Sequence, residues 1–142
     1  VDGTAFLHND LPVIGMTIRH DREDNFWFTL IHEVAHIILH YRTGLAAGFF
    51  DDIEDQALGD LEDQANLFAS ELLVPSEVWA RSPARIAKSP EPIMALAKKL
   101  SISPAILFGK ARKEREDYRL FSKHVGQGRV QRLFEEFISQ NA

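Results

Sequence analysis

The sequence has 142 residues, 45% of them hydrophobic, which is enough for one compact domain with a substantial core. It contains no cysteine, so disulfides and thiolate metal sites are excluded, and any metal must be held by histidine and carboxylate side chains. A chain without cysteine also fits a reducing cytoplasm. No run of about 18 apolar residues and no signal-peptide pattern is present, so we expect no membrane association.

The formal net charge of −5 is unevenly distributed along the chain. Residues 98–142 hold 10 of the 16 Lys and Arg but only 5 of the 21 acidic residues. Such a basic region could face nucleic acid or an acidic partner. Because acidic residues are interleaved with the basic ones there, we favour the interpretation of a solvated helix surface.

The first elements expected along the chain are a β-hairpin and a long helix. Two β-prone segments, residues 4–7 and 13–19, are separated by a turn over residues 8–12. Residues 26–41 follow as an apolar helix without glycine or proline. The hairpin therefore lies directly before the helix in the chain.

The rest of the chain reads as helical. After an acid-rich loop, residues 51–60, a second helix is expected over residues 60–73, and Pro75 stops it. The other expected elements are a helical turn, a proline-containing linker and three helices, at residues 76–81, 82–92, 93–100, 104–121 and 130–139. The predicted fold class is thus α+β: a mainly helical, zincin-like domain with a small antiparallel hairpin on the N-terminal side of the first helix. We expect residues 1–81 to form the core, and residues 82–142 to form a helical extension packed on it within the same domain.

A polar stripe runs along the first helix. With about 100° per residue, Thr29, His32, Glu33, His36 and His40 fall within a sector roughly 100° wide. The other residues from 26 to 39 are apolar and cover the remainder of the helix. Burying three imidazoles and a carboxylate in one line is costly unless a partner satisfies them, and a metal cation would do so.

The spacing within this stripe fits metal-dependent hydrolysis. Histidines at positions i and i+4 lie one turn apart on the same face, so His32 and His36 can bind one ion. Glu33 lies beside that face and can reach a metal-bound water as the general base. This is the HExxH arrangement of zinc peptidases. The alternative is a structural histidine whose ring nitrogens are hydrogen-bonded within the core. That interpretation suits a single buried histidine better than it suits this cluster.

The third ligand must come from elsewhere in the chain. The longer metzincin motif is excluded because Leu39 and Arg42 occupy the positions of its glycine and third histidine. A carboxylate on the second helix would instead give two histidines, one glutamate and water. We select Glu62, at the edge of the apolar stripe of that helix, with Asn66 one turn later as a hydrogen-bond partner for a ligand histidine. The competing acids are Asp60, Asp63 and Glu71, and Glu62 itself could be an ordinary solvated acid near a helix N-terminus.

Two blocks of sequence resemble the ImmA/IrrE metallopeptidases. They are residues 28–40, FTLIHEVAHIILH, and residues 62–75, EDQANLFASELLVP, and both match in order and spacing. Residues 96–110, LAKKLSISPAILFGK, are similar to the segment that follows the peptidase helices in that family. The resemblance covers roughly residues 13 to 112, and Gln64 departs from it because a second acid is common at that position.

The resemblance implies one zinc ion per chain, held by His32, His36 and Glu62, with Glu33 as the catalytic base. It also implies a cytoplasmic regulator that cleaves, or acts on, a helix-turn-helix repressor or an antitoxin. Many members carry an N-terminal helix-turn-helix domain, and the start at Val1 would suit a chain that lacks one. The residue that stabilises the oxyanion is open, with His40, Tyr41 and His124 as candidates. The expected site for an extended substrate is the strand over residues 13–19.

Two other classes of function remain alternatives. A non-proteolytic regulatory module would use zinc structurally, and a fourth protein ligand such as His40 would favour it. The second alternative is the C-terminal domain of a transcription regulator, since residues 96–107 could begin a helix-turn-helix followed by a basic tail. The family pattern places the same stretch beside the peptidase core, so we do not expect this chain to bind nucleic acid.

Overall fold

The computed structural model describes residues 2–40 and 55–141, and its secondary structure is mainly helical. The described residues divide into two compact units, residues 1–17 with 28–72 and residues 18–27 with 73–142. Helix α1, Glu23–His40, contributes to both. The expected mainly helical α+β class is confirmed. The proposed division at residue 81 remains a prediction.

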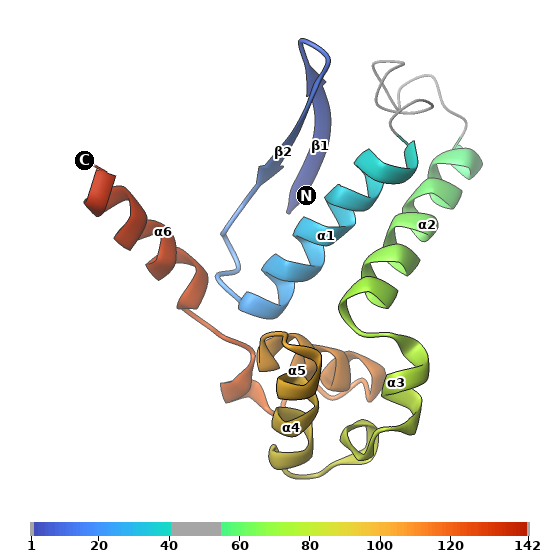
Figure 1. Cartoon of the computed structure of the whole chain (residues 1–142), viewed down its shortest axis with the longest axis vertical. Coiled ribbons are helices and arrows are strands. Elements are labelled where there is room, and N and C mark those ends of the chain that lie inside the picture. Colours follow the sequence, from blue (N-terminus) through green and yellow to red (C-terminus); the bar gives the residue numbers. More distant parts are fainter. Residues whose placement is uncertain (1, 41–54, 142) are drawn as a thin grey trace. The chain divides into compact units, whose positions relative to one another are not determined.

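The first unit contains the hairpin and the two long helices. Strands β1, Gly3–His8, and β2, Leu11–Met16, pair antiparallel with His8 opposite Leu11 (Figure 1). Asn9 and Asp10 form the two-residue turn with φ of 50° and 64°. Two consecutive positive φ values identify the type I′ turn, which matches the twist of the strands and favours Asn and Asp. The hairpin thus forms where it was predicted, but β1 extends one residue beyond the predicted segment at each end, and β2 begins two residues and ends three residues before the predicted bounds. The turn is therefore tighter than expected.

The strand β1 packs against α1. A Cβ atom on Gly3 would lie 2.7 Å from Cγ2 of Thr29 and 2.9 Å from Cγ of Glu33. Only a glycine fits this approach without a shift, since real Cβ atoms do not come so close to other heavy atoms. Because residue 3 has no side chain, the hairpin can lie directly beside the polar stripe of α1.

The buried side of α1 is its polar stripe. Glu33, His36 and His40 are buried, whereas Ile38 and Leu39 are 59% and 43% exposed. We expected the whole helix to be buried, the polar stripe included. The described elements that contact this half of α1, β1 and α2, lie on the polar side, which explains why the stripe is buried while Ile38 and Leu39 are exposed.

Helix α2, Asp55–Leu73, begins five residues earlier than predicted. Its buried row consists of Ala65 and Ala69, both 0% exposed, whereas Leu72 of the predicted apolar stripe is 58% exposed. Small buried side chains allow close packing of the helix on that side. Acidic residues near a helix N-terminus interact favourably with its dipole, which accounts for the extension into the acid-rich segment.

The second unit is built from shorter elements. They are α3 Ser76–Arg81, η3 Pro83–Ile86, α4 Glu91–Leu100, α5 Pro104–Glu114, η4 Ser122–His124 and α6 Arg129–Asn141. Its largest fully buried side chains are Ile93, Leu107 and Phe108. A helical turn capped by Ser82 interrupts the expected linker. The unit thus has a core of its own.

Helix α5 ends at Glu114, seven residues before the predicted end. Glu116 has φ of 52°, and its backbone N–H donates to Lys113 while that of Asp117 donates to Arg112. This is a Schellman motif, which normally places glycine at the left-handed position. A glutamate there gives no sequence signal, so the helix end was missed.

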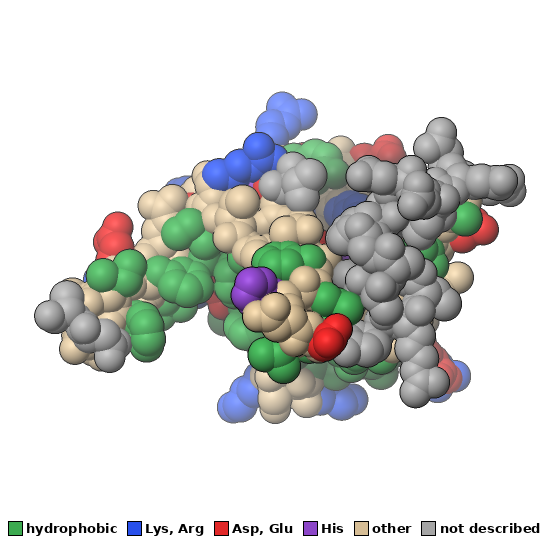
Figure 2. Space-filling view, turned by 90° about the horizontal axis from the view of Figure 1, so that it is seen from above, with side chains coloured by type: hydrophobic (Ala, Val, Ile, Leu, Met, Phe, Trp, Pro, Cys, Tyr) green, Lys and Arg blue, Asp and Glu red, His purple; other side chains and the backbone are tan. Residues whose placement is uncertain are grey.

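Most of helix α5 is buried, including Ala105, Ile106 and Ala111. A recognition helix needs a free face for the DNA groove. The packing of α5 therefore gives no support to a helix-turn-helix over residues 96–107. By contrast, α6 exposes Leu133 and Ile138, and hydrophobic side chains of this helix are visible on the left of Figure 2. None of the described helices has the length and apolar character needed to cross a membrane.

Candidate metal centre

Two histidines of α1 meet at one point. The Nε2 atoms of His32 and His36 lie 3.1 Å apart, because residues four positions apart in a helix project from the same face one turn apart. His36 is 4% exposed, and the side chain of His32 is 13% exposed. Two neutral imidazoles cannot both direct a lone pair at each other without a proton or a cation between them.

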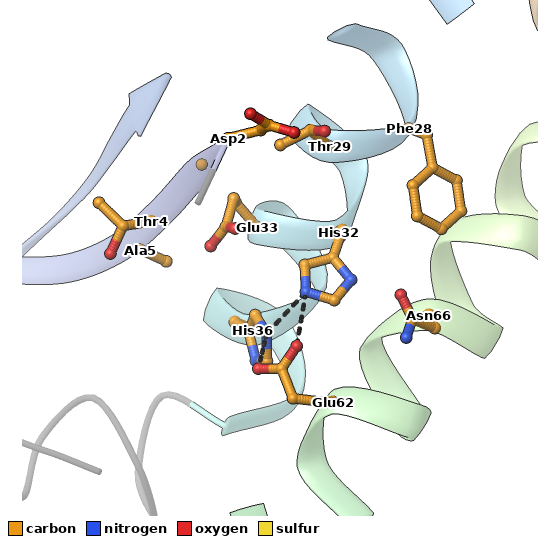
Figure 3. Close-up of a pocket in the computed structure, with 11 residues that line it drawn as sticks. Asp2, Thr4, Ala5, Phe28, Thr29, His32, Glu33, His36, Glu62 and Asn66 are labelled. Atoms are coloured by element: carbon orange, nitrogen blue, oxygen red, sulfur yellow. Dashed lines mark hydrogen bonds and ion pairs between the residues drawn. The ribbon is translucent and has the colours of Figure 1, made fainter. Parts of the chain in front are cut away.

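Helix α2 brings Glu62 to the same point. Its Oε2 lies 3.1 Å from Nε2 of His32, and its Oε1 lies 3.1 Å from Nε2 of His36 (Figure 3). The carboxylate is on the α2 row beside the buried Ala65, which places it at the edge of the contact with α1. The three side chains therefore face one another from two helices.

The distances in this triangle fit a divalent cation. Bonds of about 2.0–2.1 Å in a tetrahedral zinc site imply ligand atoms roughly 3.3 Å apart. Potential ligand atoms of His32, His36 and Glu62 all lie within 4.8 Å of one another, with 3.1 Å between the facing pairs. Two imidazoles and one carboxylate match the ligands that catalytic zinc takes, with a fourth position left for water. These residues could therefore hold a metal.

Glu33 lies beside this cluster, on the side of α1 that faces β1 (Figure 3). It is 6% exposed, and the backbone of Ala5 is hydrogen-bonded to its carboxylate. Burial raises the pKa of Glu33, and the nearby Glu62 adds to this, although His32 and the Ala5 hydrogen bond act in the opposite direction. A carboxyl group with a raised pKa is suited to accepting and releasing a proton near neutral pH.

The pKa of His36 is lowered from its ordinary value. Burial is the main cause, and the neighbouring His32 and His40 add to it, whereas Glu62 opposes it. Metal binding requires the neutral imidazole, so the environment favours the form that can act as a ligand.

A cavity of about 460 Å³ opens over the cluster. The residues that line it come from β1 and the segment before it, α1 and α2: Asp2, Gly3, Thr4, Ala5, Phe28, Thr29, His32, Glu33, His36, Glu62 and Asn66. Its volume lies within the range of small-molecule and peptide pockets. The wall on the hairpin side is β1, whereas the sequence predicted that the strand over residues 13–19 would bind substrate.

The remaining predicted residues have different positions. Asn66 lines the cavity, but Nδ1 of His32 is buried without a hydrogen-bond partner among the described residues, so the role of Asn66 stays a prediction. Tyr41 lies outside the described residues. His124 belongs to the second unit, where its ring lies 4.6 Å from that of Phe108.

His40 does not line the cavity. Its Nδ1 lies 3.0 Å from Nδ1 of His36, and its Nε2 lies 3.1 Å from Oε1 of Gln64. Both ring nitrogens are thus engaged in hydrogen bonds, one with His36 and one with Gln64, and His40 is not among the described residues that form the cluster. Apart from the departure from the family pattern at position 64, no sequence feature indicated the contact between His40 and Gln64.

Comparison with known proteins agrees with this geometry. Residues 6–107 match the model of the IrrE N-terminal-like domain, a peptidase family. No curated protein matches the chain. The match covers most of the sequence and includes both helices of the cluster. The chain therefore belongs to the IrrE N-terminal-like domain family of ImmA/IrrE metallopeptidases.

Proposed function

We propose that this protein is a zinc-dependent endopeptidase that binds one zinc ion through His32, His36 and Glu62 and acts in the cytoplasm on a regulatory DNA-binding protein. The observation that carries the proposal is the triangle of ligand atoms 3.1 Å apart, with Glu33 in the wall of the same cavity. Family membership supports a peptidase and hence a protein substrate.

The catalytic role falls to Glu33. A zinc ion held by His32, His36 and Glu62 would supply Lewis-acid chemistry for the scissile carbonyl and for the attacking water. Glu33 would act as the general base, taking a proton from water and delivering it to the leaving amine. The Ala5 backbone contact and the close packing of Gly3 hold this carboxylate in position.

The outer edge of β1 offers a binding site for an extended peptide. The register pairs Thr4 with Gly15, and Thr17 N–H donates to Asp2, so the even-numbered residues of β1 bond to the other side of the hairpin. Gly3, Ala5 and Leu7 then direct their backbone groups away from β2, with the Ala5 N–H in this row donating to the Glu33 carboxylate. Because Gly3 and Ala5 line the cavity, a substrate added as a strand along this edge passes the cluster. This replaces residues 13–19 as the proposed docking strand.

The class of substrate follows from the family resemblance. It implies a helix-turn-helix repressor or an antitoxin as the partner. Narrow recognition through strand addition is compatible with a peptidase that must not digest other cytoplasmic proteins.

The test is incubation of the purified, zinc-loaded protein with repressors and antitoxins encoded beside its gene. We expect one of them to be cut at a defined site, and Glu33→Gln to retain zinc while cleavage falls by about 10²–10⁴-fold. Regulation that persists unchanged with Glu33→Gln would overturn the proteolytic mechanism in favour of a binding module. Elemental analysis of both proteins checks that the metal is present.

A further inference from the structure

The ligand His36 is connected to the surface of α2 through two side chains. Nδ1 of His36 lies 3.0 Å from Nδ1 of His40, and Nε2 of His40 lies 3.1 Å from Oε1 of Gln64. His40 is 3% exposed, so its two ring nitrogens depend on these protein partners rather than on bulk water. A buried polar ring with both nitrogens hydrogen-bonded is held in one orientation.

The order of the protons along this chain follows from which end of the Gln64 amide faces His40, here Oε1. The amide oxygen of Gln64 can only accept, so Nε2 of His40 donates to it. A neutral imidazole carries one ring proton, so Nδ1 of His40 must accept, and Nδ1 of His36 must donate to it. The Nε2 atom of His36, which lies 3.1 Å from Glu62, is then left with its lone pair.

The reverse order would block the site. If the Gln64 amide were turned so that its NH₂ group faced His40, Nδ1 of His40 would donate to His36. His36 would then carry its proton on Nε2 and could not bind a cation. The orientation of the Gln64 amide is therefore coupled to the binding or non-binding tautomer of His36.

We propose that His40 and Gln64 are positioning residues that hold His36 in the Nδ1-protonated tautomer and orientation whose Nε2 binds the metal. The inference rests on the proposed role of His36 as a ligand. Partners of this kind fix the tautomer of metal-binding histidines and raise their basicity. This proposal assigns His40 a role other than the oxyanion or fourth-ligand roles considered from the sequence. It also assigns a function to Gln64.

The first experiment measures zinc affinity by competition with a chelator. His40→Leu removes the acceptor for His36 and should weaken binding by about 10–100-fold. His40→Asn places a carbonyl oxygen where the Nδ1 atom was and should restore most of the affinity. Gln64→Leu, at an exposed position on α2, should weaken binding roughly fivefold, as expected for the loss of one neutral hydrogen bond. Its matched control is Asp63→Leu at the neighbouring exposed position, which should change nothing.

The second experiment reads the tautomers directly in the metal-free protein. Nitrogen-15 NMR of the imidazole rings should show His36 protonated at Nδ1 and His40 protonated at Nε2, and Gln64→Leu should mix the two forms. Equal zinc affinities of wild type, His40→Leu and Gln64→Leu, or an Nε2-protonated His36 in the wild type, would overturn the inference. A wild-type protein that binds no zinc would instead refute the proposed function, while the NMR result would still decide the order of protons in the chain.

Discussion

The Nε2 atom of His32 lies 3.1 Å from Oε2 of Glu62, a residue 30 positions later in the chain. The contact joins α1 to α2 and closes the triangle with His36. Without a cation, such a group of two imidazoles and a carboxylate depends on shared protons. A bound metal would therefore stabilise the contact between the two helices as well as prepare the site for catalysis.

Glu62→Gln tests the third ligand. The substitution keeps the size of the side chain but removes the negative charge, so we expect zinc affinity to fall at least about tenfold. Asp63→Asn removes the same charge from the next, exposed position of α2 and should leave the affinity unchanged. Isothermal titration calorimetry compares the three proteins, and equal affinities of Glu62→Gln and wild type would show that another acid provides the ligand.

Gly3→Ala tests the close packing between β1 and α1. Its new methyl group would lie 2.7 Å from Cγ2 of Thr29 and 2.9 Å from Cγ of Glu33, so we expect a loss of about 1–3 kcal/mol in the free energy of unfolding. Because Glu33 must shift, cleavage of the partner should slow even where the protein remains folded.

Gly59→Ala is the matched control for that variant. Gly59 lies within α2, and a Cβ atom there meets nothing within 4 Å. Alanine is favoured over glycine in a helix, so this protein should be about 0.5–1 kcal/mol more stable, with unchanged cleavage. Urea denaturation measures both variants. Equal effects of the two substitutions would contradict the packing described for Gly3.

Glu114 should make stability depend on pH. Partial burial raises its pKa, but the hydrogen bonds from Arg85 and the Trp79 indole, together with the charge of Arg85, outweigh this and hold the pKa below its ordinary value of 4.5. Because its pKa is lower in the folded protein, Glu114 stabilises the fold at pH values above its unfolded-state pKa. This contribution disappears as the pH falls through the folded-state pKa.

Glu114→Gln should therefore be less stable than wild type at neutral pH, by a few tenths to about 1 kcal/mol. This difference in stability should vanish in acid, where the wild-type carboxyl group is protonated and is as uncharged as glutamine. Glu77→Gln is the control, because the Glu77–Arg81 pair on α3 is 74% and 80% exposed and contributes little. Denaturant titrations at several pH values check this, and a pH-independent difference would refute the ion-pair explanation.

Glu116→Gly should stabilise the end of α5. Residue 116 has φ of 52°, a left-handed conformation. This conformation is higher in free energy for a residue with a side chain than for glycine. We expect a gain of about 0.5–1 kcal/mol in the free energy of unfolding. Ala95→Gly, at an exposed position inside α4, introduces the same residue into a right-handed helix and should lose about 1 kcal/mol. A loss in both proteins would argue against the left-handed conformation of Glu116.

The residue types and spacing of the candidate site can be read from the sequence. The i and i+4 spacing of His32 and His36 is a local property of any helix, and it predicts convergence before tertiary structure is considered. The position of Glu62 at the edge of the second helix, together with the resemblance, selected it among neighbouring acids. The structure brings these three residues together, as that reasoning predicts.

The surroundings of these three residues depend on contacts between elements that are distant in the sequence. The sequence does not distinguish which strand of the hairpin lies beside the site. The packing of Gly3 against α1 makes β1 the wall of the cavity. The contact between His40 and Gln64 depends on how two helices face each other, which no local periodicity specifies. Similarly, α5 ends at Glu114 because Glu116, two residues later, takes a left-handed conformation against the intrinsic preference of a residue with a side chain. Local spacing predicts what a single element presents, whereas the contacts between elements depend on the packing of the whole chain.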